Sequence, residues 1–161
     1  MKHSKLVVAL LSSLSLAAAL PAVAVAATAS HDHGQTAAPA RLQLNQGKKW
    51  VSDAPLRQAM AVMRADLAGK LHAIHKGSLA KADYAALGKS IEGQIGNIVS
   101  QCKLEPQADA MLHIVIGELA NAAEVMQGKA TGEPAEAAHH AAQALNSYGK
   151  YFTHPGWQPI K

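Results

Sequence analysis

The sequence has a single cysteine, Cys102, among 161 residues, and aromatic residues make up only 4% of the chain. One cysteine excludes an intramolecular disulfide framework, a four-cysteine zinc site, a C-x-x-C redox pair and the C-x-x-C-H attachment of c-type haem. The phosphate-binding patterns G-x-x-x-x-G-K-[ST] and G-x-G-x-x-G are also missing. With few aromatics and 34 alanines, the composition favours helices over a β-sandwich or barrel.

Residues 1–26 have the pattern of a bacterial secretory signal peptide. Lys2 and Lys5 give a positive start, 6–20 is an apolar run interrupted only by serine, and Pro21 precedes small residues that end at Ala26. A retained membrane anchor is the alternative, but the run is short and its flanks are those of a cleaved signal. We therefore expect a periplasmic or secreted protein without a membrane span after cleavage.

Cleavage after Ala26 changes the charge balance. The whole chain carries 15 basic and 11 acidic residues, a formal charge of +4. Loss of Lys2 and Lys5 leaves 13 basic residues against the same 11 acidic ones, a charge of +2. The remaining basic residues are scattered, so no basic stripe argues for a nucleic-acid partner.

Residues 27–52 are rich in small and polar residues without a sustained period, which predicts a flexible leader. His31 and His33 lie in this leader. Short histidine-bearing tails can bind metal ions, so these two residues are weak candidate ligands.

Four segments after the leader have apolar residues at steps of three and four, the period of an amphipathic helix. Proline near the helix starts and Gly77 and Gly128 near two of the ends fit helix boundaries. The helices are expected at Ala54–Lys76, Lys81–Cys102, Pro106–Gln127 and Pro134–Phe152. Short loops between amphipathic helices make sequential neighbours antiparallel. The sequence thus predicts an all-α, antiparallel up-down-up-down four-helix bundle over 53–154, with a C-terminal tail at 155–161.

One end of such a bundle gathers a layer of soft ligands: Met60, Met63, Cys102, Met111 and His113. Thioether, thiol and imidazole groups suit Cu(I). The alternative is that the methionines fill the core and that Cys102 is a small buried apolar residue. An unpaired Cys102, or a face of the bundle, could also link two chains into a homodimer.

The other end gathers a histidine layer. His72 and His75 are one helical turn apart, and His139 and His140 lie early in the fourth helix, a neighbour of the first. A third histidine across the seam would complete a Zn(II), Cu(II) or Ni(II) site. Adjacent residues point about 100° apart around a helix, so His139 and His140 are not expected to bind the same ion. The alternative is that these histidines are simply solvated.

Catalytic patterns are missing from the sequence. It has no G-x-S-x-G and no H-E-x-x-H motif, and Glu136 to His139 is the one Glu-x-x-His where a diiron bundle needs two. A non-enzymatic role is therefore expected.

The region 55–152 resembles the cytochrome b562 family of small periplasmic four-helix cytochromes. The resemblance is carried by Leu56-Arg57-Gln58-Ala59-Met60, by Gln127-Gly128-Lys129 with the alanine-rich stretch that follows, and by Asn146-Ser147-Tyr148-Gly149-Lys150-Tyr151. It implies a bundle that binds haem b, with Met60 at the position of the axial methionine. The family's axial histidine follows the tyrosine, and this sequence has Gly149 there.

Three functions are compatible with these features. The first is a non-enzymatic periplasmic protein that binds a transition metal, with copper favoured, in metal handling or stress protection. The second is a b-type haem electron carrier that uses Met60. The third is an interaction or stress protein without a ligand.

Overall fold

The computed structural model describes residues 41–161, which fold into four α-helices. They are α1 (Ala54–His75), α2 (Lys81–Gln101), α3 (Pro106–Met126) and α4 (Pro134–Tyr151). The predicted all-α four-helix fold is confirmed, and each helix ends one residue before its expected end, within the usual uncertainty of a frayed last turn. The predicted signal peptide and the leader histidines His31 and His33 lie outside the described residues. None of the helices in the described part is long and apolar enough to cross a membrane.

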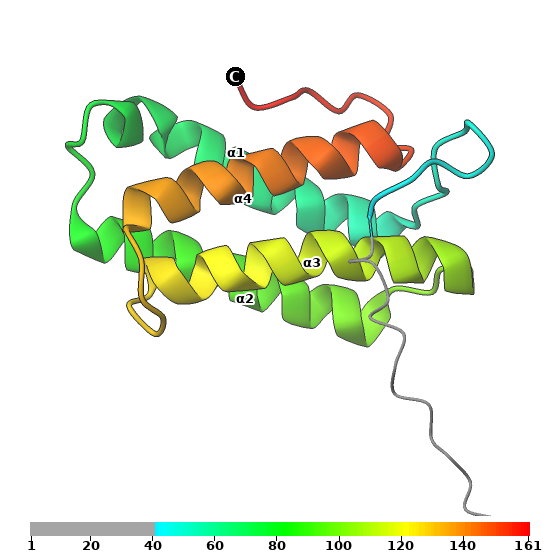
Figure 1. Ribbon diagram of the computed structural model, residues 1–161, viewed down its shortest axis with the longest axis horizontal. Helices are drawn as coiled ribbons and strands as arrows, with labels where there is room; N and C mark the ends of the chain where they lie inside the picture. The colour runs from blue at the N-terminus through cyan, green and yellow to red at the C-terminus, as the bar shows by residue number, and fades with distance from the viewer. Residues whose placement is uncertain (1–40) are drawn as a thin grey trace, which may run out of the picture. The chain divides into compact units, whose positions relative to one another are not determined.

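The four helices pack in a ring, and the colours of Figure 1 show that the chain reverses direction at each loop. Consecutive helices are in contact, α1 also packs on α4, and α2 reaches α4 across the centre of the ring. As a result, the end of α1 lies beside the start of α4, and the start of α1 lies beside the end of α4. His75 and His139 lie at the first junction, and Tyr148 and His154 lie at the second.

The helix boundaries follow from local chemistry. Asp53 caps α1 because its carboxylate accepts the N–H of Leu56, and a proline occupies the first turn of α1, α3 and α4, where a missing N–H costs nothing. Gly77 and Gly128 follow α1 and α3 with φ angles of 63° and 71°. Such left-handed residues end helices, and glycine adopts them without strain.

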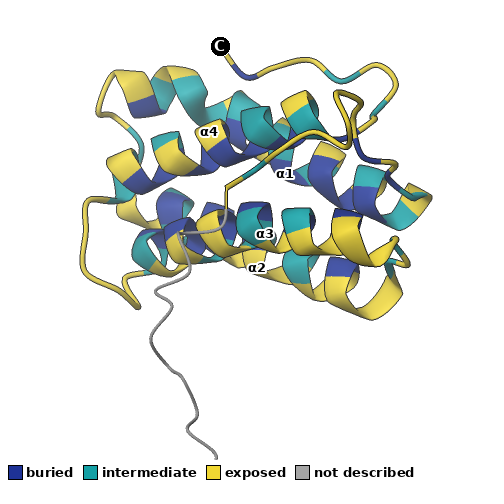
Figure 2. Ribbon diagram, turned by 45° about the vertical axis from the view of Figure 1, so that its right-hand side comes forward, coloured by how far each residue is buried: buried dark blue, intermediate teal, exposed yellow. Residues whose placement is uncertain are grey.

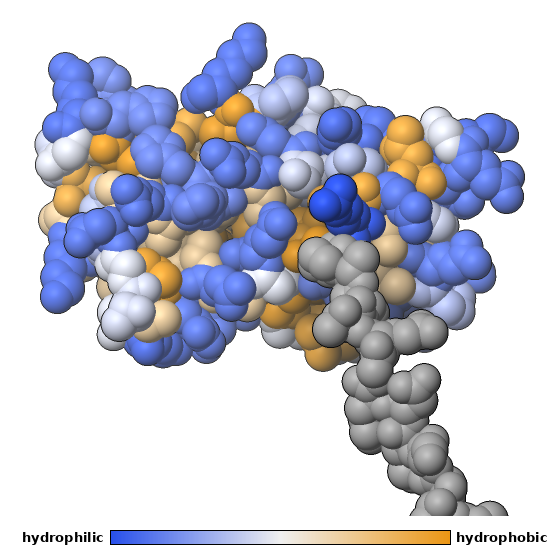
Figure 3. Space-filling view, viewed as in Figure 1, coloured by the Kyte–Doolittle hydropathy of each residue, from blue (hydrophilic) through white to orange (hydrophobic). Residues whose placement is uncertain are grey.

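Each helix buries one apolar face, as the inward-facing dark blue bands of Figure 2 show. The face of α4 consists largely of alanine. Gly88 on α2 marks a close approach to α3, because a Cβ added there would lie 2.6 Å from the carbonyl oxygen of Ala123. The face seen in Figure 3 is mostly polar, with small apolar areas scattered between the polar side chains.

The described parts of the predicted leader and tail are held on the bundle. Trp50 is only 7% exposed, its N–H donates to Tyr151, and its carbonyl accepts the N–H of Thr153, so it pairs with the chain that leaves α4. Ile160 is likewise buried. The stretches 41–52 and 155–161 lack helical periodicity, but a few large side chains hold the chain on the bundle.

Candidate functional site

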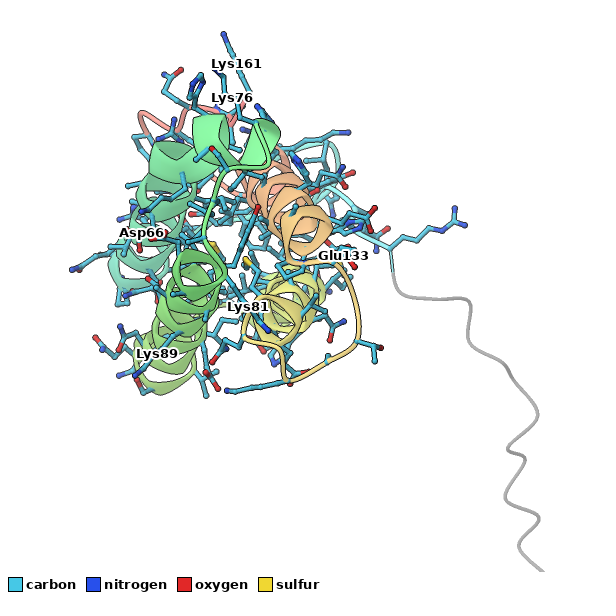
Figure 4. The ribbon with its side chains drawn as sticks, turned by 90° about the vertical axis from the view of Figure 1, so that its left-hand side faces the viewer. Asp66, Lys76, Lys81, Lys89, Glu133 and Lys161 are labelled. Atoms are coloured by element: carbon cyan, nitrogen blue, oxygen red, sulfur yellow. The ribbon has the colours of Figure 1, made fainter. Side chains whose placement is uncertain are left out.

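Two histidines meet where α1 ends and α4 begins. His75 is the last residue of α1, and His139 lies in the second turn of α4. Their rings are stacked, with centroids 5.2 Å apart and planes inclined by 12°. Figure 4 looks at this end of the bundle, where Lys76 follows α1 and Glu133 precedes α4. His75 is exposed and His139 half-buried, so an ion from solvent can reach the pair.

The other two histidines of the predicted layer are not stacked with them. His72 is exposed one turn earlier on α1, and His140 lines a groove between α3 and α4. The separation of His139 from His140 follows the expected angle between adjacent helical residues. Within 41–161, no three His, Cys, Asp or Glu side chains are arranged to hold a metal ion. The structure therefore offers a two-imidazole arrangement, with His72 as the nearest candidate for a third donor along the same helix.

The residues of the predicted soft-ligand layer differ in their surroundings. Met60 and Met63 have no exposed surface and belong to the hydrophobic core. Met111 is only partly buried, and the side chain of His113 is 67% exposed. The ring of His113 lies 2.9 Å from the carbonyl oxygen of Asp109 and 3.4 Å from its carboxylate. The prediction placed these residues at one height along the bundle, and the structure puts Met60 and Met63 in the core and His113 at the surface.

Cys102 lies at the end of α2 beside the carboxylate of Asp53. Burial and then the negative charge of Asp53 raise the pKa of the Cys102 thiol to about 12. The thiol is therefore protonated near neutral pH. Because the thiolate is the form that binds metals and reacts as a nucleophile, this environment suits an inert side chain.

Asp53 joins the starts of α1 and α3. Burial raises the pKa of its carboxyl group, but the N–H groups of Lys103 and Leu56 donate to the carboxylate and the net shift is downward. A carboxyl group whose folded-state pKa is lowered stabilises the fold above its unfolded pKa, and this contribution is lost as the pH falls through the folded pKa.

Asp53→Ala is expected to lower the free energy of unfolding by about 1–2 kcal/mol at pH 7, the usual cost of losing a helix cap. The difference from the wild type should begin to shrink below about pH 4, where the unfolded chain takes up a proton, and should be lost as the pH falls through the lowered folded-state pKa, where the native carboxylate is protonated. Urea unfolding at pH 7 and pH 3 measures both effects. Asp83→Ala is the matched control, because Asp83 makes a solvent-facing ion pair with Lys70 in the first turn of α2 and should matter less. Equal losses in the two variants would contradict the prediction.

A buried tyrosine anchors the chain that follows α4. Tyr148 has no exposed surface, and its hydroxyl lies 3.0 Å from Nδ1 of His154. Burial raises the pKa of Tyr148 to about 12, so the phenol is neutral and can donate to the imidazole. Burial, and then the charge of Arg57, lower the pKa of His154. Arg57 also donates to the carbonyl oxygen of Ser52, which connects this cluster to the start of α1.

Gly149 is covered by the side chain of Trp157. A Cβ added to Gly149 would lie 2.1 Å from Nε1 of Trp157, so the indole rests directly on the backbone of α4. The resemblance to cytochrome b562 implies an axial histidine at this position and an axial methionine at Met60. Here an indole occupies the space in front of residue 149, and Met60 is enclosed in the core. The residues present do not fit haem b.

Sequence reasoning missed Trp50 and Trp157. The two tryptophans were visible as large apolar residues in short segments without a helical period, which is the signal that could have identified them. Ser52 and Asp53 are both possible caps of the first helix from the sequence. Asp53 is the cap, and Ser52 is 3% exposed, with its hydroxyl donating to the carbonyl oxygen of Thr153.

Comparisons of the chain with known protein families, with curated proteins and with solved structures found no match. The resemblance to the cytochrome b562 family stays a prediction. The functional argument therefore rests on the residues and on their geometry alone.

Proposed function

We propose that this protein is a non-enzymatic periplasmic bundle that binds a divalent transition-metal ion, with Cu(II) favoured, in metal handling or stress protection. The observation that carries the proposal is the pairing of His75 with His139 across the seam between α1 and α4. Neutral imidazoles are ligands for Cu(II), Ni(II) and Zn(II), and among these ions Cu(II) binds such a site most strongly.

The ligand set is small and open. The nitrogen atoms of an imidazole lie on the edge of the ring. An ion shared by His75 and His139 would therefore lie beside the two stacked rings. Binding requires one ring to rotate about its Cβ–Cγ bond, a torsion with a broad and shallow energy profile. His72 lies one turn before His75 on the same face of α1, but in the structure described it is not arranged with the pair as a third ligand. Water completes the coordination on the exposed side. The histidine pair therefore favours Cu(II), whereas the soft-ligand residues considered in the sequence favoured Cu(I).

An ion held in this way joins the first helix of the bundle to the last. Binding to the folded state alone stabilises it by about 2.7 kcal/mol when the free ion is at 100 times its dissociation constant. Metal binding is therefore expected to raise the melting temperature.

His75→Ala and His139→Ala are each expected to weaken Cu(II) binding at least tenfold, because a site of two imidazoles cannot lose one and keep its chelate. The measurement is calorimetric titration of the signal-cleaved chain with Cu(II), in a background in which His31 and His33 are alanine so that the leader does not contribute. His72→Ala should give a smaller loss.

His113→Ala is the matched control, because His113 is an exposed histidine on α3, a helix that does not contribute to the pair. It should bind Cu(II) like the parent chain. Unchanged affinity in both His75→Ala and His139→Ala would overturn the proposal. Absence of any copper-dependent shift in melting temperature would favour a protein without a ligand.

A further inference from the structure

The C-terminal strap, defined as residues 153–161, runs back along the bundle from the end of α4, as the red trace in Figure 1 shows. The side-chain amide of Asn146 on α4 pairs with the backbone of Ile160 in both directions, at 2.9 and 2.8 Å. Arg64 on α1 donates to the carbonyl oxygen of Gln158 and lies 5.9 Å from the ring centroid of Trp157. The strap is thus held to α1 and α4 by specific contacts.

His154 is the first anchor of the strap. Its Nδ1 faces the hydroxyl of Tyr148 at 3.0 Å, and its ring also lies against Trp157, with centroids 4.9 Å apart. The phenol of Tyr148 donates to Nδ1 when the neutral imidazole carries its hydrogen on Nε2. A protonated imidazole carries a hydrogen on both nitrogens, so the phenol must then turn and accept instead of donating. Protonation therefore reverses this contact and places a positive charge on a half-buried ring, which favours a neutral His154 in the docked strap.

Arg57 on α1 is the charged group that, after burial, lowers the pKa of His154. Lys49 from the segment before α1 and Lys150 from α4 line the same hollow of about 310 Å³ as His154, and Arg64 on α1 lies against the neighbouring Trp157. The acidic group on this side is Asp53, which acts on Tyr148, and its carboxylate already accepts the N–H groups of Leu56 and Lys103. An imidazolium at residue 154 would thus be half-buried and repelled by the charge of Arg57.

We propose that the strap is an acid-sensitive latch, in which protonation of His154 releases residues 153–161 and uncovers the face of α4 around Asn146 and Gly149. The latch lies at the opposite end of α4 from His139, so it does not depend on the metal site. One feature favours release: Nε1 of Trp157 is buried without a hydrogen-bond partner while the strap is docked, and release returns it to water.

The direction of the pH effect follows from the pKa of His154, which is lowered in the docked state. Docking is at full strength above about pH 6.5, the ordinary value for histidine, and weakens as the pH falls below it, because only the released strap then takes up the proton. The ratio of released to docked strap rises by about tenfold for each unit by which docking lowers the pKa.

Hydrogen exchange of the signal-cleaved chain, followed by NMR between pH 7.5 and 5.0, tests the latch. The reporter is the amide of Ile160, which donates to Asn146, and its protection is corrected for the pH dependence of intrinsic exchange. We expect protection of Ile160 to fall severalfold toward pH 5, while the amide of Leu119 in the middle of α3 keeps its protection. His154→Asn should remove this dependence, because the asparagine oxygen replaces Nδ1 as an acceptor and does not titrate.

His113→Asn is the control and should retain the wild-type dependence. Constant protection of Ile160 over this pH range, or an unchanged fall in His154→Asn, would overturn the proposal. If the strap of His154→Asn is open at every pH, the test rests on the wild-type protein. The ring resonances of its His154 should titrate with the same midpoint as the loss of Ile160 protection. A different midpoint overturns the proposal.

Discussion

Met60→Ala is expected to lower the free energy of unfolding by about 2–5 kcal/mol, the range for truncating a fully buried large side chain. Met60 has no exposed surface, and α1 buries it in the same cluster as Leu56 and Met63. The alanine leaves a cavity that neighbouring helices fill only in part. Urea unfolding of the two proteins at pH 7 measures the loss.

Met111→Ala is the comparison variant, because Met111 is only partly buried and should cost less than half as much. The same Met60 variant separates a core residue from a ligand. Its affinity for Cu(II) at His75 and His139 should match that of the wild type wherever the protein is folded. A variant that keeps its stability but loses metal binding, or a wild type that gains a Met60-dependent Soret band with haem, would show that Met60 is a ligand.

Gly149→Ala is expected to destabilise the protein by about 1–3 kcal/mol, the usual cost of overpacking. The added methyl group would overlap Trp157, with 2.1 Å between Cβ and Nε1, so the strap must shift or undock. Urea unfolding gives the magnitude, and loss of protection at the Ile160 amide shows that the strap is the part affected.

Two variants make this interpretation specific. Gly117→Ala places a methyl group on a helix with no atom within 4 Å, and it should stabilise by about 0.5–1 kcal/mol because alanine is the better helix former. In a Trp157→Ala background, Gly149→Ala should lose its cost and behave like Gly117→Ala. An equal penalty in both backgrounds would mean that the strain arises elsewhere in α4.

The fold could be predicted from the sequence because its signals are local. Stripes of apolar residues at helical spacing, proline in the first turns and glycine after α1 and α3 each depend on a few neighbouring residues. Helix faces also predict different surroundings for His139 and His140, and the structure places His139 against His75 and His140 in a groove. The soft-ligand layer rests on axial height, which does not define the side of a helix that a residue occupies, and His113 faces solvent while Met60 faces the core.

The anchoring of both chain ends could not be predicted in the same way. Trp50 and Trp157 are single large side chains in irregular segments, so no repeating pattern of apolar residues predicts that they are packed on the bundle. Their positions depend on contacts with residues about 100 positions away, as in the pairing of Trp50 with Phe152. The hydrogen bond between Tyr148 and His154 needs the strap to turn back, which a helical pattern does not indicate.

The pairing of Trp50 with Phe152 keeps the chain entering α1 and the chain leaving α4 at the same end of the bundle. The chain enters α1 and leaves α4 at one pole, and His75 and His139 lie at the other. A tether or fused partner joined ahead of Trp50 therefore holds the domain by the pole remote from His75 and His139. The proposed metal site would then project away from the tether, open to exchange of an ion with a second protein.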